Sequence, residues 1–250
     1  MKPRRRALAV APHPDDEAAG LTIALSRLGR RYERFVVYAT TGVRGGSAGF
    51  GPAGERGVRE RRGEAVEGMR MLGIPEENLI FLENGSWSLH NGLHAFAREL
   101  ERIAAAISPE VIFSPAVEHA HPDHDSARAA AEGLRLRGNA ALLEYALYSS
   151  PGGTGLFNEF ASRHAGTALN ASRREAAMKA EIISCYRSQG EILSFFSKTR
   201  ESVRHAAPLE PGGIIPKEPV FGEVFSDWKR RDVITAYESI LEFAGERGYW

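Results

Sequence analysis

Residues 7–20 read ALAVAPHPDDEAAG and join a short apolar run to a histidine and three consecutive carboxylates. The run at residues 7–11 is followed by a proline and predicts a buried β-strand. Apolar residues recur at helical spacing over residues 17–30, so a helix is expected there. The carboxylates at residues 15–17 repel one another unless a cation lies nearby. This stretch therefore predicts a strand, a polar turn beside a cation, and a helix.

Strand-like and helix-like segments alternate through the first 150 residues. Apolar and β-branched segments predict further strands at residues 34–42, 78–82, 110–116 and 141–148, and amphipathic segments predict helices at residues 55–72 and 89–107. A helix after the fourth strand is expected to begin near Asp125, whose carboxylate can cap its backbone N–H groups. Nearly continuous apolar strands separated by helices are typical of a parallel sheet covered on both faces. The predicted fold class is α/β, a Rossmann-like doubly wound, mostly parallel sheet sandwiched by helices.

The last hundred residues are less regular. They are expected to form a long loop at residues 149–170, a helix at residues 173–186, a proline-containing loop and a final helix at residues 229–245. No repeat, low-complexity tract or interdomain linker interrupts the chain. We therefore expect a single domain over residues 1–250, with a Rossmann-like core at 1–148 and a less regular C-terminal part at 149–250.

Composition narrows the class of protein. Lys plus Arg and Asp plus Glu both number 32 in the 250 residues, so no global field favours nucleic acid. The single cysteine, Cys185, excludes an intramolecular disulfide and a cysteine-rich metal site. The basic start of the chain imitates a signal peptide, but its apolar run is shorter than the about 7–15 residues that such a segment needs. No apolar run approaches the ~20 residues that span a bilayer. We expect a cytoplasmic protein without a transmembrane segment.

Two polar clusters follow predicted strands. HPDDE, residues 13–17, comes after the first strand, and EHAHPDH, residues 118–124, comes after the fourth. In doubly wound sheets these strands are often neighbours, and ligands bind at their carboxyl ends where the strand order reverses. We therefore expect the two loops to meet. Histidines and aspartates from two loops that meet at one point indicate a divalent metal.

The residue types suit a catalytic zinc site, which takes three His, Asp or Glu ligands and keeps a position for water. His13, Asp16 and His124 are the predicted ligands, although mixed nitrogen and oxygen sites also accept Fe²⁺ or Co²⁺. Asp15 is left beside the metal and is the predicted general base. HPDD or HPDH alone is equally compatible with a simple turn or helix cap, but their joint occurrence favours the metal site.

Two more residues of the second loop have predicted catalytic roles. His121, as an imidazolium, is expected to stabilise the oxyanion of a tetrahedral intermediate and to protonate a departing amine. Asp123 is expected to orient one of the two histidines beside it, His121 or His124, and to raise its basicity.

PHPDDE and HPDH together resemble the LmbE-like or PIG-L family of zinc-dependent de-N-acetylases. Weaker similarity extends to five other segments, namely TTG at 40–42, RRGEAVEGMRMLGI at 61–74, FLENGS at 81–86, KAEIISCYRSQ at 179–189 and GEVF at 222–225. The resemblance implies a hydrolase that removes an N-acetyl group from an N-acetylglucosamine-like moiety of a small molecule, glycolipid or oligosaccharide. Carried over by position, it implies the same metal ligands, general base and partner histidine as the residue chemistry.

The resemblance also suggests substrate-binding residues. Arg61 corresponds to an arginine that holds polar groups of the substrate in some members, although a solvated helix face explains it equally well. Arg44 follows the TTG segment, one residue beyond the position where many members carry a glutamate, and Asn84 stands where an aspartate is common. The family further implies that the C-terminal part, roughly residues 149–219, walls the pocket and sets specificity.

Two alternatives stay open. The first is a zinc amidase that acts on a different N-acyl conjugate in another pocket. The second is a non-catalytic nucleotide- or carbohydrate-binding protein, but the first turn after a strand lacks G-x-G-x-x-G and offers carboxylates where a pyrophosphate needs N–H donors. The expected partners are small-molecule or glycan substrates and no nucleic acid, and the sequence specifies no oligomeric state.

Overall fold

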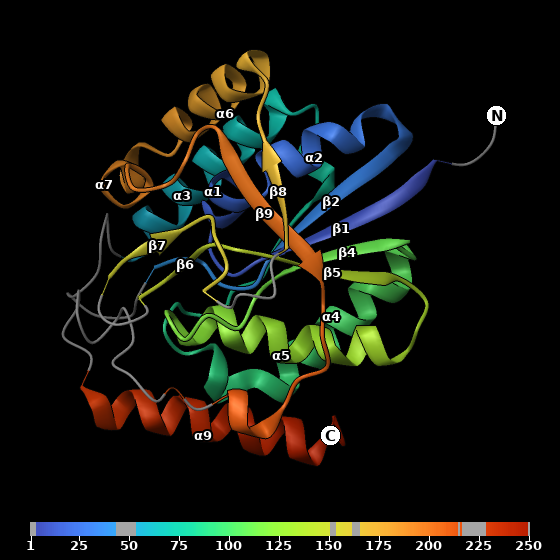
Figure 1. Cartoon of the computed structure of the whole chain (residues 1–250), viewed down its shortest axis with the longest axis vertical. Coiled ribbons are helices and arrows are strands. Elements are labelled where there is room, and N and C mark those ends of the chain that lie inside the picture. The colour runs from blue at the N-terminus through green and yellow to red at the C-terminus, as the bar shows by residue number, and fades with distance from the viewer. Residues whose placement is uncertain are drawn as a thin grey trace.

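A computed structural model describes residues 4–43, 54–150, 154–161, 166–214, 216 and 229–249. Its centre is a seven-stranded sheet with the strand order β3-β2-β1-β4-β5-β9-β8. The strands are β1 (Arg5–Ala11), β2 (Tyr32–Tyr38), β3 (Leu79–Phe81), β4 (Val111–Pro115), β5 (Ala141–Tyr145), β8 (Thr167–Asn170) and β9 (Arg200–His205). Helices cover both faces of this sheet (Figure 1), as the α/β prediction required.

The strand order places a switch point beside β1. Strands β1 to β5 pair in parallel, with β1 between β2 and β4. The chain winds outward in one direction through β2 and β3 and in the other through β4 and β5. The loops that leave β1 and β4 therefore emerge side by side at the carboxyl edge, where open α/β sheets bind ligands.

Each face of the sheet has its own hydrophobic core. One face is covered by α1 (Asp16–Gly20), α2 (Thr22–Leu28), α3 (Gly54–Met71) and α6 (Arg173–Cys185), and the other by α4 (Leu93–Ile107), α5 (Pro122–Leu136) and α9 (Arg230–Glu246). Alternate residues of β1 point to opposite faces, so Leu8 and Val10 join the second core while the alanines on either side join the first. Because β1 is buried on both faces, its sequence is apolar throughout.

The helix expected over residues 17–30 is divided in two. Helix α1 ends at Gly20, where a Cβ atom would lie 2.7 Å from the ring of Tyr145. The Lys179 ammonium donates to the Ala19 carbonyl at the end of α1, over 2.7 Å. The Glu201 carboxylate accepts the N–H groups of Ile23 and Ala24 in the first turn of α2. Distant polar side chains thus satisfy the two helix ends that the break exposes.

Helix α5 begins earlier than expected. It starts at Pro122, and the His121 side chain caps it by accepting the N–H of Asp123 over 3.1 Å. The prediction of a start near Asp125 is wrong, because the Asp125 carboxylate accepts instead the N–H groups of Glu118 and His119. This contact fixes the loop between β4 and α5.

The C-terminal part contains strands that the sequence did not predict. The expected loop at residues 149–170 includes β8 and one strand of the hairpin formed by β6 (Tyr148–Ser149) and β7 (Leu156–Phe157), and β9 precedes the proline-containing loop. These strands are short or carry charged residues, as in RESVRH of β9, so they lack the apolar pattern of a core strand. Strand β9 pairs antiparallel with β5 and thereby attaches the C-terminal part to the main sheet.

Short helical segments complete the described chain. They are the 3₁₀ turns Gly29–Arg31, Glu76–Asn78, Leu89–Gly92, Arg187–Gln189 and Pro211–Gly213, together with α7 (Gly190–Leu193). Among the described residues, every helix is too short or too polar to span a bilayer.

Candidate active site

The loops after β1 and β4 bring the three predicted metal ligands together. His13 Nδ1 lies 3.2 Å from Asp16 Oδ2 and 3.3 Å from His124 Nε2. His124 Nε2 lies 3.5 Å from Asp16 Oδ2. All three side chains are buried. Residues separated by 111 positions in the chain thus place three donor atoms in a compact triangle.

The triangle has the size that a tetrahedral metal site requires. Bonds of about 2.0–2.2 Å to a tetrahedral zinc place its ligand atoms roughly 3.3–3.6 Å apart. The other ring nitrogen of His124, Nδ1, is buried and has no hydrogen-bond partner among the described residues. Donor atoms of His13 also group within 4.8 Å with those of His121 and His124, and with those of Asp15 and Asp16. The donor set fits a divalent cation.

Charge in the cluster favours a cation at this point. Burial lowers the pKa of His13, but its contacts with Asp123 and Asp16 outweigh burial and raise that pKa to about 10. Burial raises the pKa of Asp16, but the nearby His124 and His13 outweigh it and lower that pKa to about 2. The buried carboxylates therefore stabilise positive charge beside them, whether a proton on His13 or a metal ion.

Asp123 anchors the cluster to a third loop. Its Oδ2 lies 3.1 Å from His13 Nε2 and accepts the N–H of Trp87 over 2.6 Å. Its Oδ1 accepts the N–H of Leu89 over 3.0 Å. These contacts hold the His13 ring so that Nδ1, the other nitrogen, faces Asp16 and His124. The sequence predicted that Asp123 would orient His121 or His124, whereas its carboxylate contacts the ring of His13 from the other loop. No sequence pattern indicated the backbone donors after β3.

Asp15 lies beside the triangle and contacts Arg61. The Arg61 Nη2 atom is 2.8 Å from Asp15 Oδ2 and 3.1 Å from the Pro14 carbonyl oxygen, and its Nη1 donates to the Gly42 carbonyl. Arg61 is only 5% exposed, which excludes the solvated helix face. Burial raises the pKa of Asp15 to about 6, although the charge of Arg61 opposes the rise. A carboxylate with this pKa suits proton transfer near neutral pH.

His121 differs from the expectation of an imidazolium. Its Nδ1 accepts the N–H of Asp123, so the proton of the neutral ring is on Nε2. Burial, together with the neighbouring charge of His13, lowers the pKa of His121 well below its ordinary value. The structure therefore favours a neutral ring that donates from Nε2. The Trp87 ring packs against it at a centroid distance of 4.1 Å.

The predicted substrate-binding residues are not all part of this cluster. Arg61 is, through Asp15. The Asn84 side chain donates to the Ala39 carbonyl over 2.9 Å, so it links the loops after β2 and β3. Arg44 lies outside the described residues.

Sequence reasoning assigned no role to Glu17, the third carboxylate of the first loop. It is fully buried, and its Oε1 accepts the hydroxyl protons of Tyr38, over 2.8 Å, and of Tyr186. Its Oε2 accepts the N–H of Asp15 over 3.1 Å. Burial raises the pKa of Glu17 to about 8. In the sequence only the run of three acidic residues pointed to Glu17. Its tyrosine partners come from β2 and the end of α6, so no local pattern links them to it.

Aromatic rings connect the cluster with the C-terminal part. The ring of Tyr148 in β6 meets that of His124 edge-on at 5.1 Å. The rings of Phe157 in β7 and Phe196 after α7 follow at 6.1 and 6.0 Å from Tyr148. Phe195 stacks on Phe157 and is 59% exposed. Ring contacts thus run from the buried triangle to the surface.

Several solved structures share this fold. A deacetylase of teicoplanin biosynthesis superposes with a TM-score of 0.60 and 18% identity, covering 75% of this chain and 86% of that one. The N,N′-diacetylchitobiose deacetylase of Pyrococcus horikoshii gives 0.61 and 17%, covering 82% and 85%. The 4-carboxy-2-hydroxymuconate hydratase of Pseudomonas putida KT2440 gives 0.54 and 16%, covering 82% and 98%. At these identities the similarity shows the fold alone.

The family comparison concerns the part of the chain that carries the site. A search of curated proteins gives no significant match. The family model PIG-L, described as GlcNAc-PI de-N-acetylase, matches residues 8–134, which include both polar loops and just over half of the chain. The protein is therefore a member of the PIG-L family.

Proposed function

We propose that the protein is a metal-dependent hydrolase that removes the N-acetyl group from an N-acetylglucosamine-like moiety of a small molecule, glycolipid or oligosaccharide. The observation that carries this proposal is the buried triangle of His13, Asp16 and His124 with a further carboxylate, Asp15, beside it. A non-catalytic binding protein has no need for an uncoordinated carboxylate beside a metal, whereas a hydrolase uses one as its general base. Membership of the PIG-L family supports the same chemistry.

His13, Asp16 and His124 would hold the cation, and zinc is the proposed metal. When bound, zinc supplies Lewis-acid polarisation of the acetyl carbonyl and makes a water more acidic. Asp15 takes a proton from the attacking water as the water oxygen bonds to the carbonyl carbon. Arg61 holds the Asp15 carboxylate in place through its 2.8 Å contact.

His121 and Asp15 complete the reaction. The Nε2–H of the neutral His121 ring donates a hydrogen bond to the oxygen that becomes negatively charged. As the C–N bond breaks, the proton held by Asp15 passes to the departing nitrogen. The immediate products are acetic acid and a free amine, which together contain all the atoms of the amide and one water. The acid then loses its proton to the amine or to solvent and leaves as acetate.

The acceptor side of the pocket is proposed to come from the C-terminal part. Support comes from the ring contacts that link His124 through Tyr148 to Phe157 and Phe195. Flat apolar rings pack well against the hydrophobic face of a sugar or an apolar aglycone. Asn84 and Arg44 stay proposed contacts for sugar hydroxyls.

The test combines acetate release with metal content for the wild type and two neighbouring variants. Asp15→Asn should keep bound metal and lose roughly 10²–10⁴-fold in turnover, because only the proton acceptor is removed. Asp16→Asn should lose the metal itself, because it removes a ligand. Unchanged turnover in Asp15→Asn would exclude that residue as the base.

A panel of substrates separates the proposal from its alternatives. It would contain N-acetylated sugars, conjugates with longer N-acyl groups, and unsaturated carboxylic acids, since one structure of this fold is a hydratase. Acetate released from the N-acetylated sugars supports the deacetylase. If the metal-loaded enzyme acts only on the longer amides or hydrates the acids, the proposed substrate is wrong.

A further inference from the structure

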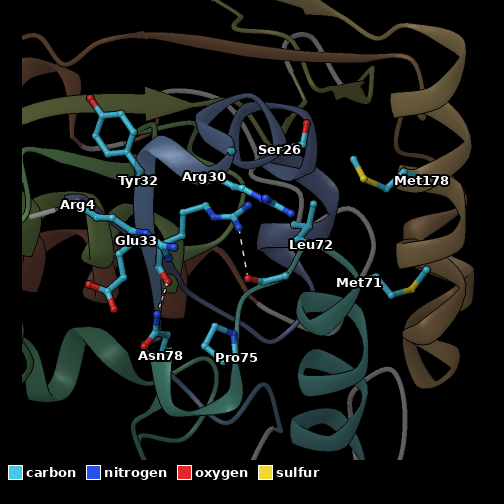
Figure 2. Close-up of a pocket in the computed structure, with 13 residues that line it drawn as sticks. Arg4, Ser26, Arg30, Tyr32, Glu33, Met71, Leu72, Pro75, Asn78 and Met178 are labelled. Atoms are coloured by element: carbon cyan, nitrogen blue, oxygen red, sulfur yellow. Dashed lines mark hydrogen bonds between the residues drawn. The ribbon is translucent and has the colours of Figure 1, made fainter. Parts of the chain in front are cut away.

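A cavity of about 510 Å³ opens at the edge of the sheet opposite the candidate active site (Figure 2). It lies at the amino ends of β1, β2 and β3, whereas the metal ligands follow the carboxyl ends of β1 and β4. Seven residues of β1 separate the two edges, a span of roughly 23 Å at about 3.3 Å per residue. A ligand in this cavity therefore does not touch the catalytic residues.

Guanidinium groups dominate the charge of the cavity. Arg4, Arg30 and Arg34 line it together with one carboxylate, Glu33. Glu33 already lies 3.5 Å from a cation, Arg6. The cavity thus carries positive charge that its own lining does not neutralise, and a concave site concentrates such a field.

The three arginines differ in how much they are already bound. Arg34 donates to the carbonyls of Leu25 and Gly73 over 3.2 and 3.3 Å, so it is fixed in place. Arg4 and Arg30 are exposed, and their side chains make no hydrogen bond or ion pair with any described residue. Two of the lining arginines are therefore available to bind an anion, and the third is held in place by backbone carbonyls.

The opposite side of the cavity is apolar. Met71 of α3, 44% exposed, and Met178 of α6 line it with Leu72. Figure 2 shows Arg4 and Tyr32 at one side, the two methionines at the other, and Arg30 between them. Methionine side chains are flexible and adapt to ligands of varied shape. The cavity therefore has a basic end and an adaptable apolar end.

We propose that this cavity binds a small soluble phosphate monoester whose apolar portion lies against Met71 and Met178. Guanidinium groups pair with phosphate through two parallel hydrogen bonds, which favours phosphate over a spherical anion. The volume lies within the about 300–1,000 Å³ of ordinary small-molecule sites. This site is independent of the proposed deacetylase activity.

The experiment measures binding of hexyl phosphate and of inorganic phosphate to the metal-loaded full chain by calorimetry. The decisive pair of variants is Arg30→Gln and Arg31→Gln. Arg31 is exposed and adjacent in sequence, but it does not line the cavity, so both variants lose the same charge. Arg30→Gln should weaken hexyl phosphate binding about tenfold or more, and Arg31→Gln less than about twofold. Hexyl phosphate should bind more tightly than inorganic phosphate, and Met71→Ser should reduce this advantage.

Other results overturn the proposal. Equal binding by the wild type and Arg30→Gln would place the phosphate elsewhere, for example at the metal. Equal losses in both arginine variants would indicate only general charge attraction. A soluble ligand in this cavity would also be excluded if neither hexyl phosphate nor inorganic phosphate bound. The same holds if anionic phosphatidylglycerol vesicles bound in an Arg30-dependent manner while hexyl phosphate did not.

Discussion

Replacing Lys179 with methionine should destabilise the protein more than any exposed ion-pair substitution. The Lys179 Nζ atom is 2.8 Å from Glu201 Oε1 and 2.7 Å from the Ala19 carbonyl oxygen, and both charged residues are fully buried. Methionine keeps the length of the side chain but leaves the Glu201 charge without its cation. Breaking a buried pair in this way costs about 3–5 kcal/mol. In a chain of this size that loss lowers Tm by about 10 °C.

Urea unfolding of three variants measures this loss and locates its cause. Arg187→Met is the control, because its ion pair with Glu67 spans 3.0 Å between side chains that are 65% and 53% exposed. It should cost no more than about 1 kcal/mol. The third variant adds Glu201→Gln to Lys179→Met. The loss in unfolding free energy caused by Glu201→Gln should be about 2 kcal/mol smaller in this background than in the wild type, because the substitution then removes a buried carboxylate that has no cation.

Two outcomes would refute this reasoning. The first is a loss in Lys179→Met as small as that in the Arg187→Met control. The second is strict additivity of the Lys179 and Glu201 substitutions. Either would mean that backbone N–H groups alone stabilise the Glu201 carboxylate and that the break between α1 and α2 does not need the ammonium.

Three shorter predictions use other features. In α3, Gly68→Ala should cost about 1–3 kcal/mol in urea unfolding, because its Cβ would lie 2.8 Å from a tyrosine ring of the end of α6. Gly63→Ala, with no atom within 4 Å, should instead stabilise the same helix by up to about 1 kcal/mol, and equal effects would contradict this. The pKa of Glu175 is lowered to about 2 by its hydrogen bond from an arginine, so its contribution is complete above the unfolded pKa of about 4.3 and lost as pH falls towards 2. Glu175→Gln should therefore destabilise by about 1 kcal/mol at pH 6 and progressively less below pH 4 in thermal unfolding; a constant difference would refute the assignment. Asp123→Asn should weaken metal binding about 10–100-fold in chelator competition, because it frees the His13 ring, and unchanged affinity would exclude that role.

The sheet could be predicted from the sequence because the apolar pattern of each core strand indicates that the strand is buried. β1 is apolar at every buried position and is followed by a polar turn, so strand, edge and loop are all visible in fourteen residues. β9 is different, because RESVRH is stabilised by partners that lie far away in the chain. Glu201 in this strand looks like a surface residue until the structure places Lys179 beside it. Charged core strands of this kind have no local signature.

The same distinction applies to the site. His13, Asp16 and His124 were predicted because strand-end loops of a doubly wound sheet meet at a known place. Arg61 remained ambiguous because arginines at positions 59 and 62 surround it, and only burial separates it from them. Which nitrogen of the neutral His121 ring carries the proton depends on one backbone N–H, which no side-chain pattern encodes. The sequence therefore predicted which side chains come together in the cluster, but not how they are oriented or protonated.

The order of these elements along the chain separates two kinds of change. All three predicted metal ligands precede β5, whereas the rings of Phe157 and Phe195 come after it. Natural variation or grafting in this later segment can therefore exchange the proposed acceptor surface without replacing a proposed metal ligand. The exchange has one constraint. The later segment also supplies Lys179 and Glu201, whose side chains hydrogen-bond to the backbone at the break between α1 and α2. A transplanted segment that lacks this pair would leave unsatisfied the helix ends at the break between α1 and α2, directly after the first polar loop.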